Sequence, residues 1–223
     1  MGTLLILLLL IVGGYAAGAW HGRRRARELT RSLSERNEEL QAARTELARL
    51  SALDGLTQLA TQQYFQDFLE KEWRRSLREL TPISLIVIDL DHFKAYNERL
   101  GHEAGDGCLK RVADALRTTV GRPGDVVARY GGEEFAVALS RTDSSGAISL
   151  ASKLQASVTA LKLPHPASPA GNHVTISLGV ATAIPNRGTT WQEIELVAAA
   201  ERALLEAKQL GRNRIASAEF QPS

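Results

Sequence analysis

Residues 126–139 read VVARYGGEEFAVAL, in which two glycines and two glutamates separate two apolar runs. Gly-Gly between β-prone runs is typical of a two-residue hairpin turn, because glycine reaches the positive φ values that such turns require. Successive strand residues point to opposite faces of a sheet. At least one of Glu133 and Glu134 therefore points toward any ligand that binds at this end of the sheet. The hairpin alone leaves two interpretations open, solvated acids at a turn or carboxylates that hold a cation.

The sequence on both sides of this hairpin alternates between expected helices and strands. The expected helices are 64–80, 92–100, 105–120, 145–161 and 190–210, and the other expected strands are 83–90, 173–183 and 214–218. Together they span about 170 residues, a length that suits one α/β domain. The unbroken apolar run 83–88 indicates a strand buried on both faces, which by itself favours a parallel sheet.

The composition is that of a globular protein, with 223 residues of which 44% are hydrophobic and 23% charged. A net charge of +2, with no aromatic side chains interleaved in a basic stripe, argues against a nucleic-acid partner. The only cysteine, Cys108, cannot form an internal disulfide, and no Cys/His set has zinc-ligand spacing. A reducing compartment fits these observations.

Residues 3–20, TLLILLLLIVGGYAAGAW, carry no charge and are about long enough to cross a membrane as a helix. No Lys or Arg precedes them, whereas RRRAR follows at 23–27. The positive-inside rule therefore predicts a single-pass anchor over 1–22 in the inner (cytoplasmic) membrane, with the rest of the chain in the cytoplasm. A cleaved signal peptide is the alternative, because AAGA resembles a small-residue cleavage site.

The segment 23–53 carries a heptad seam with one charged position. The seam residues are spaced alternately by four and three: Leu29, Leu33, Arg36, Leu40, Ala43, Leu47 and Leu50. This spacing predicts a short parallel coiled coil, although an amphipathic helix on the membrane surface is also compatible with it. A coiled coil would make the protein a homodimer and hold two copies of the domain 54–223 side by side.

Acidic residues also follow the buried strand. Asp89 ends it, so its carboxylate should emerge at the rim of the sheet, and a hairpin paired beside the strand would bring Glu133 close. Converging carboxylates favour a divalent cation such as Mg²⁺, which proteins commonly hold together with substrate phosphates. Asp91 suits either a metal ligand or an N-cap for the helix near 92. Lys94 and Asn97 share a helical face and could reach one ligand.

Five blocks of the sequence, in order, resemble the GGDEF family of diguanylate cyclases in its Gly-Gly-Glu-Glu-Phe variant. They are LDGLT at 53–57, IDLDHFKAYNERLGHEAGD at 88–106, RYGGEEF at 129–135, VTISLGVA at 174–181 and AKQLGRNR at 207–214. The resemblance covers about residues 52–217. It implies a nucleotidyl-cyclase palm, an α/β fold with a central, mainly antiparallel sheet surrounded by helices, in place of the parallel sheet that the apolar run favours.

The resemblance also implies an activity and a site. Members of this family condense two GTP molecules, one on each of two facing domains, into cyclic di-GMP and two pyrophosphates, with two Mg²⁺ or Mn²⁺ ions per active site. Carried over by position, the metal ligands are Asp89, Glu133 and the carbonyl of Leu90, and the catalytic residues are Glu133, Glu134 and Lys94.

Further residues match the family's substrate contacts. Asn97 and Asp106 match the residues that bind the guanine edge, for which an amide and a carboxylate are suited, although Asp106 could also be a helix cap. Gly131 and Gly132 allow the backbone to approach the nucleotide. Lys94, Lys208 and Arg212 match phosphate contacts, although Lys208 and Arg212 would also complement the dipole at the end of a helix.

The stretch RPGD at 122–125 places Arg122 and Asp125 at the family's RxxD inhibitory site, which implies product inhibition by cyclic di-GMP. Pro-Gly-Asp is also ordinary turn chemistry. The sequence departs from the family where Gly, Asn, Arg and Arg are usual, at Gln58, Thr61, Gln62 and Gln63. Because the metal and guanine positions are intact, the sequence predicts an active cyclase. The alternatives are a catalytically silent domain that binds GTP or cyclic di-GMP and a membrane-anchored adaptor.

Overall fold

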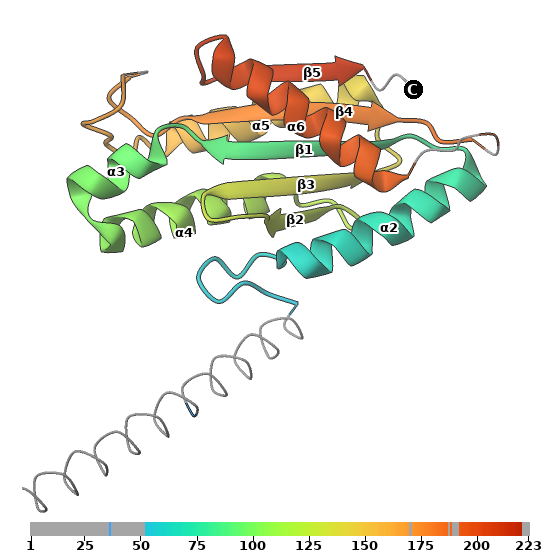
Figure 1. The fold of residues 1–223 in the computed structure, drawn as a ribbon, viewed down its shortest axis with the longest axis horizontal. Helices are drawn as coiled ribbons and strands as arrows, with labels where there is room; N and C mark the ends of the chain where they lie inside the picture. Colours follow the sequence, from blue (N-terminus) through green and yellow to red (C-terminus); the bar gives the residue numbers. More distant parts are fainter. Residues whose placement is uncertain (1–35, 37–51, 170, 187, 189–191, 220–223) are drawn as a thin grey trace, which may run out of the picture. The chain divides into compact units, whose positions relative to one another are not determined.

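The computed structural model describes residues 36, 52–169, 171–186, 188 and 192–219 (Figure 1). The chain divides into two compact units, 1–50 and 51–223. The membrane anchor predicted over 1–22, and nearly all of the coiled coil predicted over 23–53, lie outside the described residues. Within the described residues, no helix has both the length and the apolar character needed to cross a membrane.

One mixed sheet forms the centre of the described domain, with the strand order β2-β3-β1-β4-β5. Its strands are β1 (Ile83–Leu90), β2 (Val126–Arg129), β3 (Glu134–Ser140), β4 (Ile176–Ala183) and β5 (Ile215–Glu219). Neighbouring strands are antiparallel except for β4 and β5, which are parallel. The prediction of a mainly antiparallel sheet is confirmed, and the prediction of a parallel sheet from the apolar run 83–88 is wrong.

The helices cover both faces of this sheet. They are α2 (Gln62–Glu79), α3 (Phe93–Leu100), α4 (His102–Thr119), α5 (Ser144–Ala160) and α6 (Glu193–Gln209). In Figure 1, α2 and α6 lie in front of the sheet and α5 lies behind it. Strand β1 is central and buried along its whole length. Its unbroken apolar run therefore reflects coverage of both faces by helices, and this coverage does not depend on strand direction.

Alternation along β1 divides the core into two clusters. Ile86, Ile88 and Leu90 belong to the cluster that includes residues of α4 and α5. Leu85 and Val87 belong to the cluster that includes residues of α2 and α6. Because side chains two positions apart share a face, this alternation predicts that Asp89 points to the side of the sheet that α6 covers.

The other boundaries agree with the sequence prediction to within about three residues. The largest differences are at three starts. Helix α4 begins at His102 and so contains the glycines that were expected at its start, β4 begins at Ile176, and α6 begins at Glu193. Gly101 precedes α4 with a φ of 87°, a conformation that favours glycine.

Candidate active site at the end of strands β1 and β3

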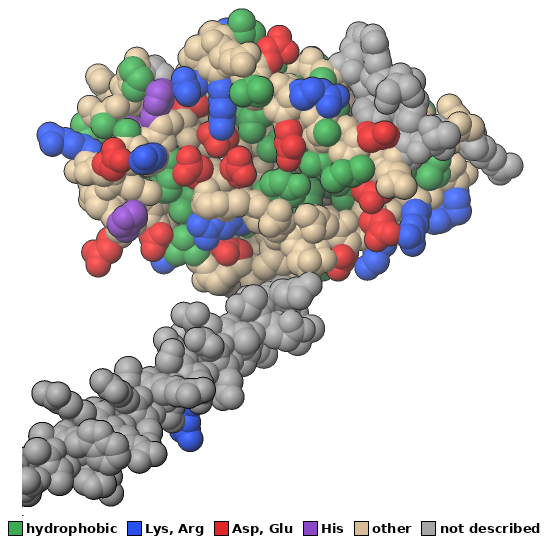
Figure 2. Space-filling view, viewed as in Figure 1, with side chains coloured by type: hydrophobic (Ala, Val, Ile, Leu, Met, Phe, Trp, Pro, Cys, Tyr) green, Lys and Arg blue, Asp and Glu red, His purple; other side chains and the backbone are tan. Residues whose placement is uncertain are grey.

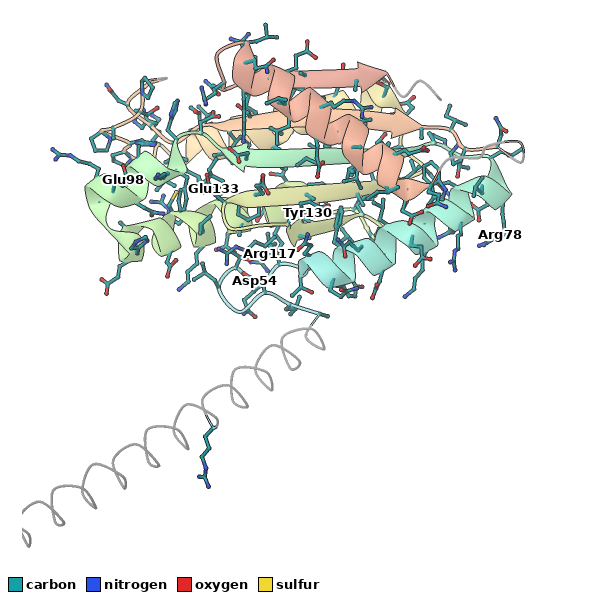
Figure 3. All side chains as sticks on the ribbon, in the orientation of Figure 1. Asp54, Arg78, Glu98, Arg117, Tyr130 and Glu133 are labelled. Atoms are coloured by element: carbon teal, nitrogen blue, oxygen red, sulfur yellow. The ribbon has the colours of Figure 1, made fainter. Side chains whose placement is uncertain are left out.

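The hairpin lies beside the end of β1, as predicted. Asp89 is directly opposite Glu134 in the antiparallel pair, and the amide N–H of Leu90 donates to the carbonyl of Glu133 at 3.3 Å. Figure 3 shows Glu133 at this end of the sheet, next to β1. Residues that are more than forty positions apart in the sequence therefore meet at one edge.

The tip of the hairpin differs from the predicted two-residue turn. Strand β2 ends at Arg129 and β3 begins at Glu134, so four residues connect them. The amides of Tyr130 and Gly131 both donate to the carbonyl of Glu134, at 2.8 and 3.1 Å. Neither glycine has a positive φ. The side chain of Glu134 limits the space at Gly131 instead, because a Cβ there would lie 2.7 Å from Oε2 of Glu134, whereas a Cβ at Gly132 would meet nothing within 4 Å.

The carboxylates at this edge repel one another. Asp89 is 6% exposed, and burial raises its pKa, with smaller increases from the charges of Glu134 and Asp91. The ammonium of Lys208, on α6, lies 2.8 Å from Oδ2 of Asp89 and lowers this pKa in part. Burial and the charge of Asp89 likewise raise the pKa of Glu133. The edge thus carries negative charge that one lysine only partly neutralises, and the front face in Figure 2 shows acidic side chains gathered with basic ones nearby.

These residues fit a divalent cation that arrives with a nucleotide. The described residues contain no group of three or more His, Cys, Asp or Glu side chains placed to hold a metal ion. Asp89 and Glu133 are two carboxylates whose charges interact at this edge, and Leu90 directly follows Asp89 in the chain. Mg²⁺ usually takes one or two protein carboxylates and completes its shell with water and substrate phosphate oxygens, so this smaller donor set suits it, and Mn²⁺ also prefers oxygen ligands.

A second part of the site lies between α3 and α4. The Oδ1 atom of Asn97 is buried and has no hydrogen-bond partner among the described residues. A Cβ at Gly105 would lie 1.9 Å from this atom, so only glycine leaves room for Asn97. A buried amide oxygen without a partner is costly unless a ligand donates to it. Sequence reasoning did not single out Gly105, although a glycine inside an amphipathic helix is a recognised signal of close packing.

The neighbours of Asn97 clarify two further predictions. Asp106 is exposed in the second turn of α4, whose N-cap is Gly101, so the helix-cap interpretation of Asp106 is wrong. Two positions along, Cys108 is 2% exposed, and burial raises the pKa of its thiol to about 11. The side chain of Lys94 is 89% exposed and lies 4.0 Å from Glu98. Lys94 and the buried amide oxygen of Asn97 therefore do not point to one site in this structure.

Asp91 is neither a helix cap nor a free ligand. The N-cap of α3 is His92, which has a φ of 58° and makes no side-chain capping hydrogen bond. Both carboxylate oxygens of Asp91 accept hydrogen bonds. The donors are Ser177 of β4, Thr175 directly before β4, and Asn213 in the segment that joins α6 to β5. The same joining segment carries Arg212, whose charge contributes to the lowered pKa of His92.

The side chain of Arg129 holds the tip of the hairpin through hydrogen bonds and an ion pair. Its Nε and Nη2 atoms donate to the carbonyl of Gly132 at 3.2 and 2.8 Å, and its Nη1 atom lies 3.3 Å from Oδ1 of Asp54. The same oxygen of Asp54 accepts from the amide and the hydroxyl of Thr57, at 2.8 and 2.6 Å. Figure 3 shows Asp54 in the loop that precedes α2. The first loop of the domain is thereby connected to the Gly-Gly tip, a contact that sequence reasoning missed.

The unusual residues before and within α2 have local roles. Thr61 is the N-cap of α2, a position where Thr replaces Asn at little cost. Gln58 has a φ of 56°, which explains why glycine is usual at this position. Burial raises the pKa of the Tyr130 hydroxyl in the hairpin, and the side chains of Gln66 and Gln62 lower this pKa in part.

The stretch RPGD forms a turn. The amide of Asp125 donates to the carbonyl of Arg122 at 3.2 Å, and Gly124 has a φ of 95°, as the third position of a type II turn requires. Oδ1 of Asp125 accepts from the amide of Ser140 at 3.1 Å, and the side chain of Arg122 is exposed. The turn interpretation is confirmed, and it leaves the arginine accessible to a ligand.

Comparison with known proteins agrees with this geometry. The family model described as "Diguanylate cyclase, GGDEF domain" matches residues 51–214. Probable diguanylate cyclase DgcT of Escherichia coli (strain K12) is 35% identical over 162 residues, which make up 73% of this chain. The matched segment is 34% of DgcT, so this chain corresponds to about a third of that relative.

Solved structures share the fold. The coiled coil and GGDEF domain of DgcB from Caulobacter crescentus, in complex with c-di-GMP, superposes with a TM-score of 0.68 at 30% identity and covers 85% of this chain and 99% of that one. The active GGEEF domain of a diguanylate cyclase from Vibrio cholerae has a TM-score of 0.62 at 27% identity and covers 74% of this chain and all of that one.

Proposed function

Since this chain belongs to the GGDEF-domain family of diguanylate cyclases, we propose that it condenses two GTP molecules into cyclic di-GMP and two pyrophosphates. The observation that carries this proposal is the meeting of Asp89 and Glu133, two carboxylates with raised pKa values, at the end of β1 beside the ammonium of Lys208. A purely structural hairpin would not need converging acids whose ionisation the fold opposes.

The reaction requires two facing domains. The 3′-hydroxyl of each GTP attacks the α-phosphorus of the other, a new phosphorus–oxygen bond forms, and the bond to pyrophosphate breaks. Glu134, which neighbours both proposed metal ligands, supports the loss of the hydroxyl proton. Asp89, Glu133 and the carbonyl of Leu90 would hold Mg²⁺ or Mn²⁺, which would supply positive charge to stabilise the charge that develops in phosphoryl transfer.

The other site residues position the nucleotide. The buried Oδ1 of Asn97 accepts from the guanine edge, and Asp106 accepts from the neighbouring donors of the same base. Gly131 and Gly132 keep side-chain atoms away from the tip of the hairpin. Lys208 and Arg212 bind phosphate oxygens, and Lys94 reaches them from its exposed position on α3.

Assembly and feedback complete the proposal. The segment 23–53 forms a parallel coiled coil that pairs two chains, and residues 1–22 anchor the dimer in the inner membrane with the cyclase domain in the cytoplasm. The coverage of this chain by the DgcB structure that includes a coiled coil supports the pairing. Arg122 and Asp125 bind the product cyclic di-GMP and slow the enzyme, for which the exposed arginine in the RPGD turn is the supporting feature.

The test is incubation of the protein with GTP and Mg²⁺ followed by identification of the products by mass spectrometry. Cyclic di-GMP and pyrophosphate in a one-to-two ratio are expected. Binding of GTP without turnover would identify a catalytically silent nucleotide-binding domain instead. Charged residues introduced at Leu40 and Leu47 should make specific activity fall on dilution, and activity independent of concentration in that variant would contradict pairing through the coiled coil.

A further inference from the structure

Asp91 occupies a position that the proposed reaction does not explain. It is 1% exposed, two residues beyond Asp89 on the same side of the chain. The hydroxyl of Thr175 donates to Oδ2 at 2.7 Å, the hydroxyl of Ser177 donates to Oδ1 at 2.7 Å, and the backbone amide of Asn213 donates to Oδ2 at 3.0 Å. A buried carboxylate with hydrogen bonds on both oxygens is suited to hold other groups in place.

The group that Asp91 holds is an unusual piece of backbone. Three consecutive residues after α6, Gly211, Arg212 and Asn213, have φ values of 114°, 62° and 47°. Non-glycine residues adopt the left-handed region only under constraint from their surroundings. Two hydrogen bonds constrain this segment. The amide of Arg212 donates to the carbonyl of Ala207 at 3.1 Å, and the side-chain amide of Gln155 donates to Oδ1 of Asn213 at 3.1 Å. The hydrogen bond from the amide of Asn213 to Asp91 links this segment to the residue that directly follows β1.

Two neighbouring acids thus make different contacts, Asp89 at the end of β1 with the last turn of α6 and Asp91 just beyond β1 with the segment after α6. Asp89 pairs with Lys208 through an ion pair between side chains, which a nucleotide and its cation can replace. Asp91 bonds to the backbone of Asn213, next to Arg212, and stays buried among hydroxyl groups. We infer that Asp91 is a positioning residue that fixes the backbone of 212–213, so that Arg212 presents its guanidinium to the phosphates, and that it contacts neither metal nor substrate.

This inference rests on the proposed function of the site, and it predicts a specific pattern of substitutions. Asp91→Ala removes all three bonds and frees the segment that carries Arg212. Asp91→Asn can keep all three, because its amide oxygen can accept from Thr175 and Asn213 while its NH₂ group donates to the hydroxyl of Ser177. A metal ligand would behave in the opposite way, because the loss of one carboxylate charge alone would disable it.

The experiment measures binding of 3′-deoxy-GTP with Mg²⁺ to the full-length chain, alongside initial rates with GTP. The analogue lacks the attacking hydroxyl, so it reports binding without turnover. The variants are Asp91→Ala, Asp91→Asn, Arg212→Ala and the double variant Asp91→Ala/Arg212→Ala. Ser84→Ala is the matched control, because Ser84 is a buried hydroxyl of β1 that bonds to Thr142 and Thr182 away from the site.

We expect Asp91→Ala and Arg212→Ala to weaken binding by similar factors, the double variant to be little weaker than Arg212→Ala, and Asp91→Asn to restore most of the affinity. Ser84→Ala should lower thermal stability and leave binding unchanged. If Asp91→Ala does not fold, Thr175→Val, which removes one of the two bonds on Oδ2, should weaken binding in the same non-additive way with Arg212→Ala.

Three results would overturn the inference. Losses that multiply in the double variant would show that Asp91 acts independently of Arg212. Parental binding by Asp91→Ala with reduced stability would leave it a purely structural role. Loss of turnover in Asp91→Asn with binding intact would make it a catalytic residue. A parental chain that binds 3′-deoxy-GTP but forms no cyclic di-GMP would refute the proposed function, and the binding comparison would still decide the role of Asp91.

Discussion

An arginine and an acid lie at each end of strand β2, but the residue that is held by protein contacts is the acid at one end and the arginine at the other. Before the strand, the carboxylate of Asp125 is held by the amide of Ser140 and the side chain of Arg122 is exposed. After it, Arg129 is held by Gly132 and Asp54, while Glu133 faces the like charge of Asp89. An acid without sufficient positive charge near it suits a cation, and an exposed arginine suits an anion. Four residues of strand thus separate two sites of opposite chemistry.

Neutralising the acids at the end of β1 should have the largest effect. Glu133→Gln and Asp89→Asn should each lower cyclic di-GMP formation by roughly 100-fold or more, because a bound metal supplies several kcal/mol of transition-state stabilisation. Glu103→Gln, an exposed acid in the first turn of α4, is the matched control and should retain the parental rate. Since folding raises the pKa of Glu133, Glu133→Gln should leave the melting temperature unchanged or higher.

A parental rate in either neutralised variant would refute the metal assignment. A rate lost together with the melting transition would point instead to a structural role for the acid, and circular dichroism of the same samples separates the two outcomes.

Loss of the contacts that Arg129 makes at the tip of the hairpin should have the next largest effect. Arg129→Ala removes the bonds to Gly132 and Asp54 and should lower the rate by about 10- to 100-fold, since small displacements of catalytic groups are costly. Asp54→Asn keeps the bond from Thr57 but loses the ion pair, so it should lower the rate less. Initial rates at saturating GTP test this order. Equal rates for the parental protein and Arg129→Ala would show that the tip keeps its geometry without these contacts.

The pH profile provides a third comparison. The folded-state pKa values of Asp89 and Glu133 are raised, so both carboxylates take up protons on acidification at a higher pH than exposed acids do. The acid limb of kcat/KM should therefore lie above about pH 4, the range of unperturbed carboxyl groups. Lys208→Gln should move this limb further up, because Lys208 lowers the pKa of Asp89. A limb that does not move in this variant would separate Lys208 from the titrating acid.

At the other end of β2, substitution should alter feedback and leave chemistry intact. Arg122→Ala removes an exposed planar cation, so progress curves should stay near the initial rate as product accumulates, whereas the parental enzyme slows. The free energy of unfolding should change by no more than about 0.5 kcal/mol. Equal sensitivity of both proteins to added cyclic di-GMP would reduce the RPGD stretch to a turn.

The smallest effect is expected at Gln58, which lies at neither end of β2. Gln58→Gly relieves a left-handed non-glycine residue that costs about 1–2 kcal/mol, less the added chain entropy of glycine of about 0.5–1 kcal/mol. The free energy of unfolding should rise by about 1 kcal/mol or less, measured by urea denaturation, with rate and feedback unchanged. A loss of stability would mean that the bonds from Gln58 to Asp54 and Gly55 outweigh the strain.

The sequence predicted the elements of this domain better than their directions. Hydrophobic periodicity located the helices and β1, because it reports which faces are covered. It could not report strand direction, because a central antiparallel strand covered on both faces gives the same apolar run as a parallel one. The resemblance of five motif blocks supplied the antiparallel topology. It did not reveal that α4 begins at His102, because glycines inside a helix look like its boundary.

The part of the site that depends only on strand pairing could be predicted from the sequence. The placement of Asp89 beside Glu133 follows from the pairing of β1 with a hairpin. Contacts that join side chains to distant backbone were not predictable, since no periodicity links Arg129 to Asp54, 75 positions apart, or Asp91 to Asn213, 122 positions apart. The positive-φ argument for the Gly-Gly tip was wrong, because neither glycine has a positive φ, and that argument could not anticipate the space that Glu134 takes beside Gly131.

The buried thiol of Cys108 can report local opening of the protein without an introduced label. The Cys108 side chain is 2% exposed and belongs to the same buried cluster as Phe93 and Tyr96 of α3, so it lies where α3 and α4 pack. Alkylating reagents attack thiolates, which are scarce for a group with a pKa of about 11. Alkylation must therefore wait for α4 to separate from α3. The rate of alkylation then measures how often α3 and α4 separate, and a nucleotide that holds them together should slow the reaction in proportion to its occupancy.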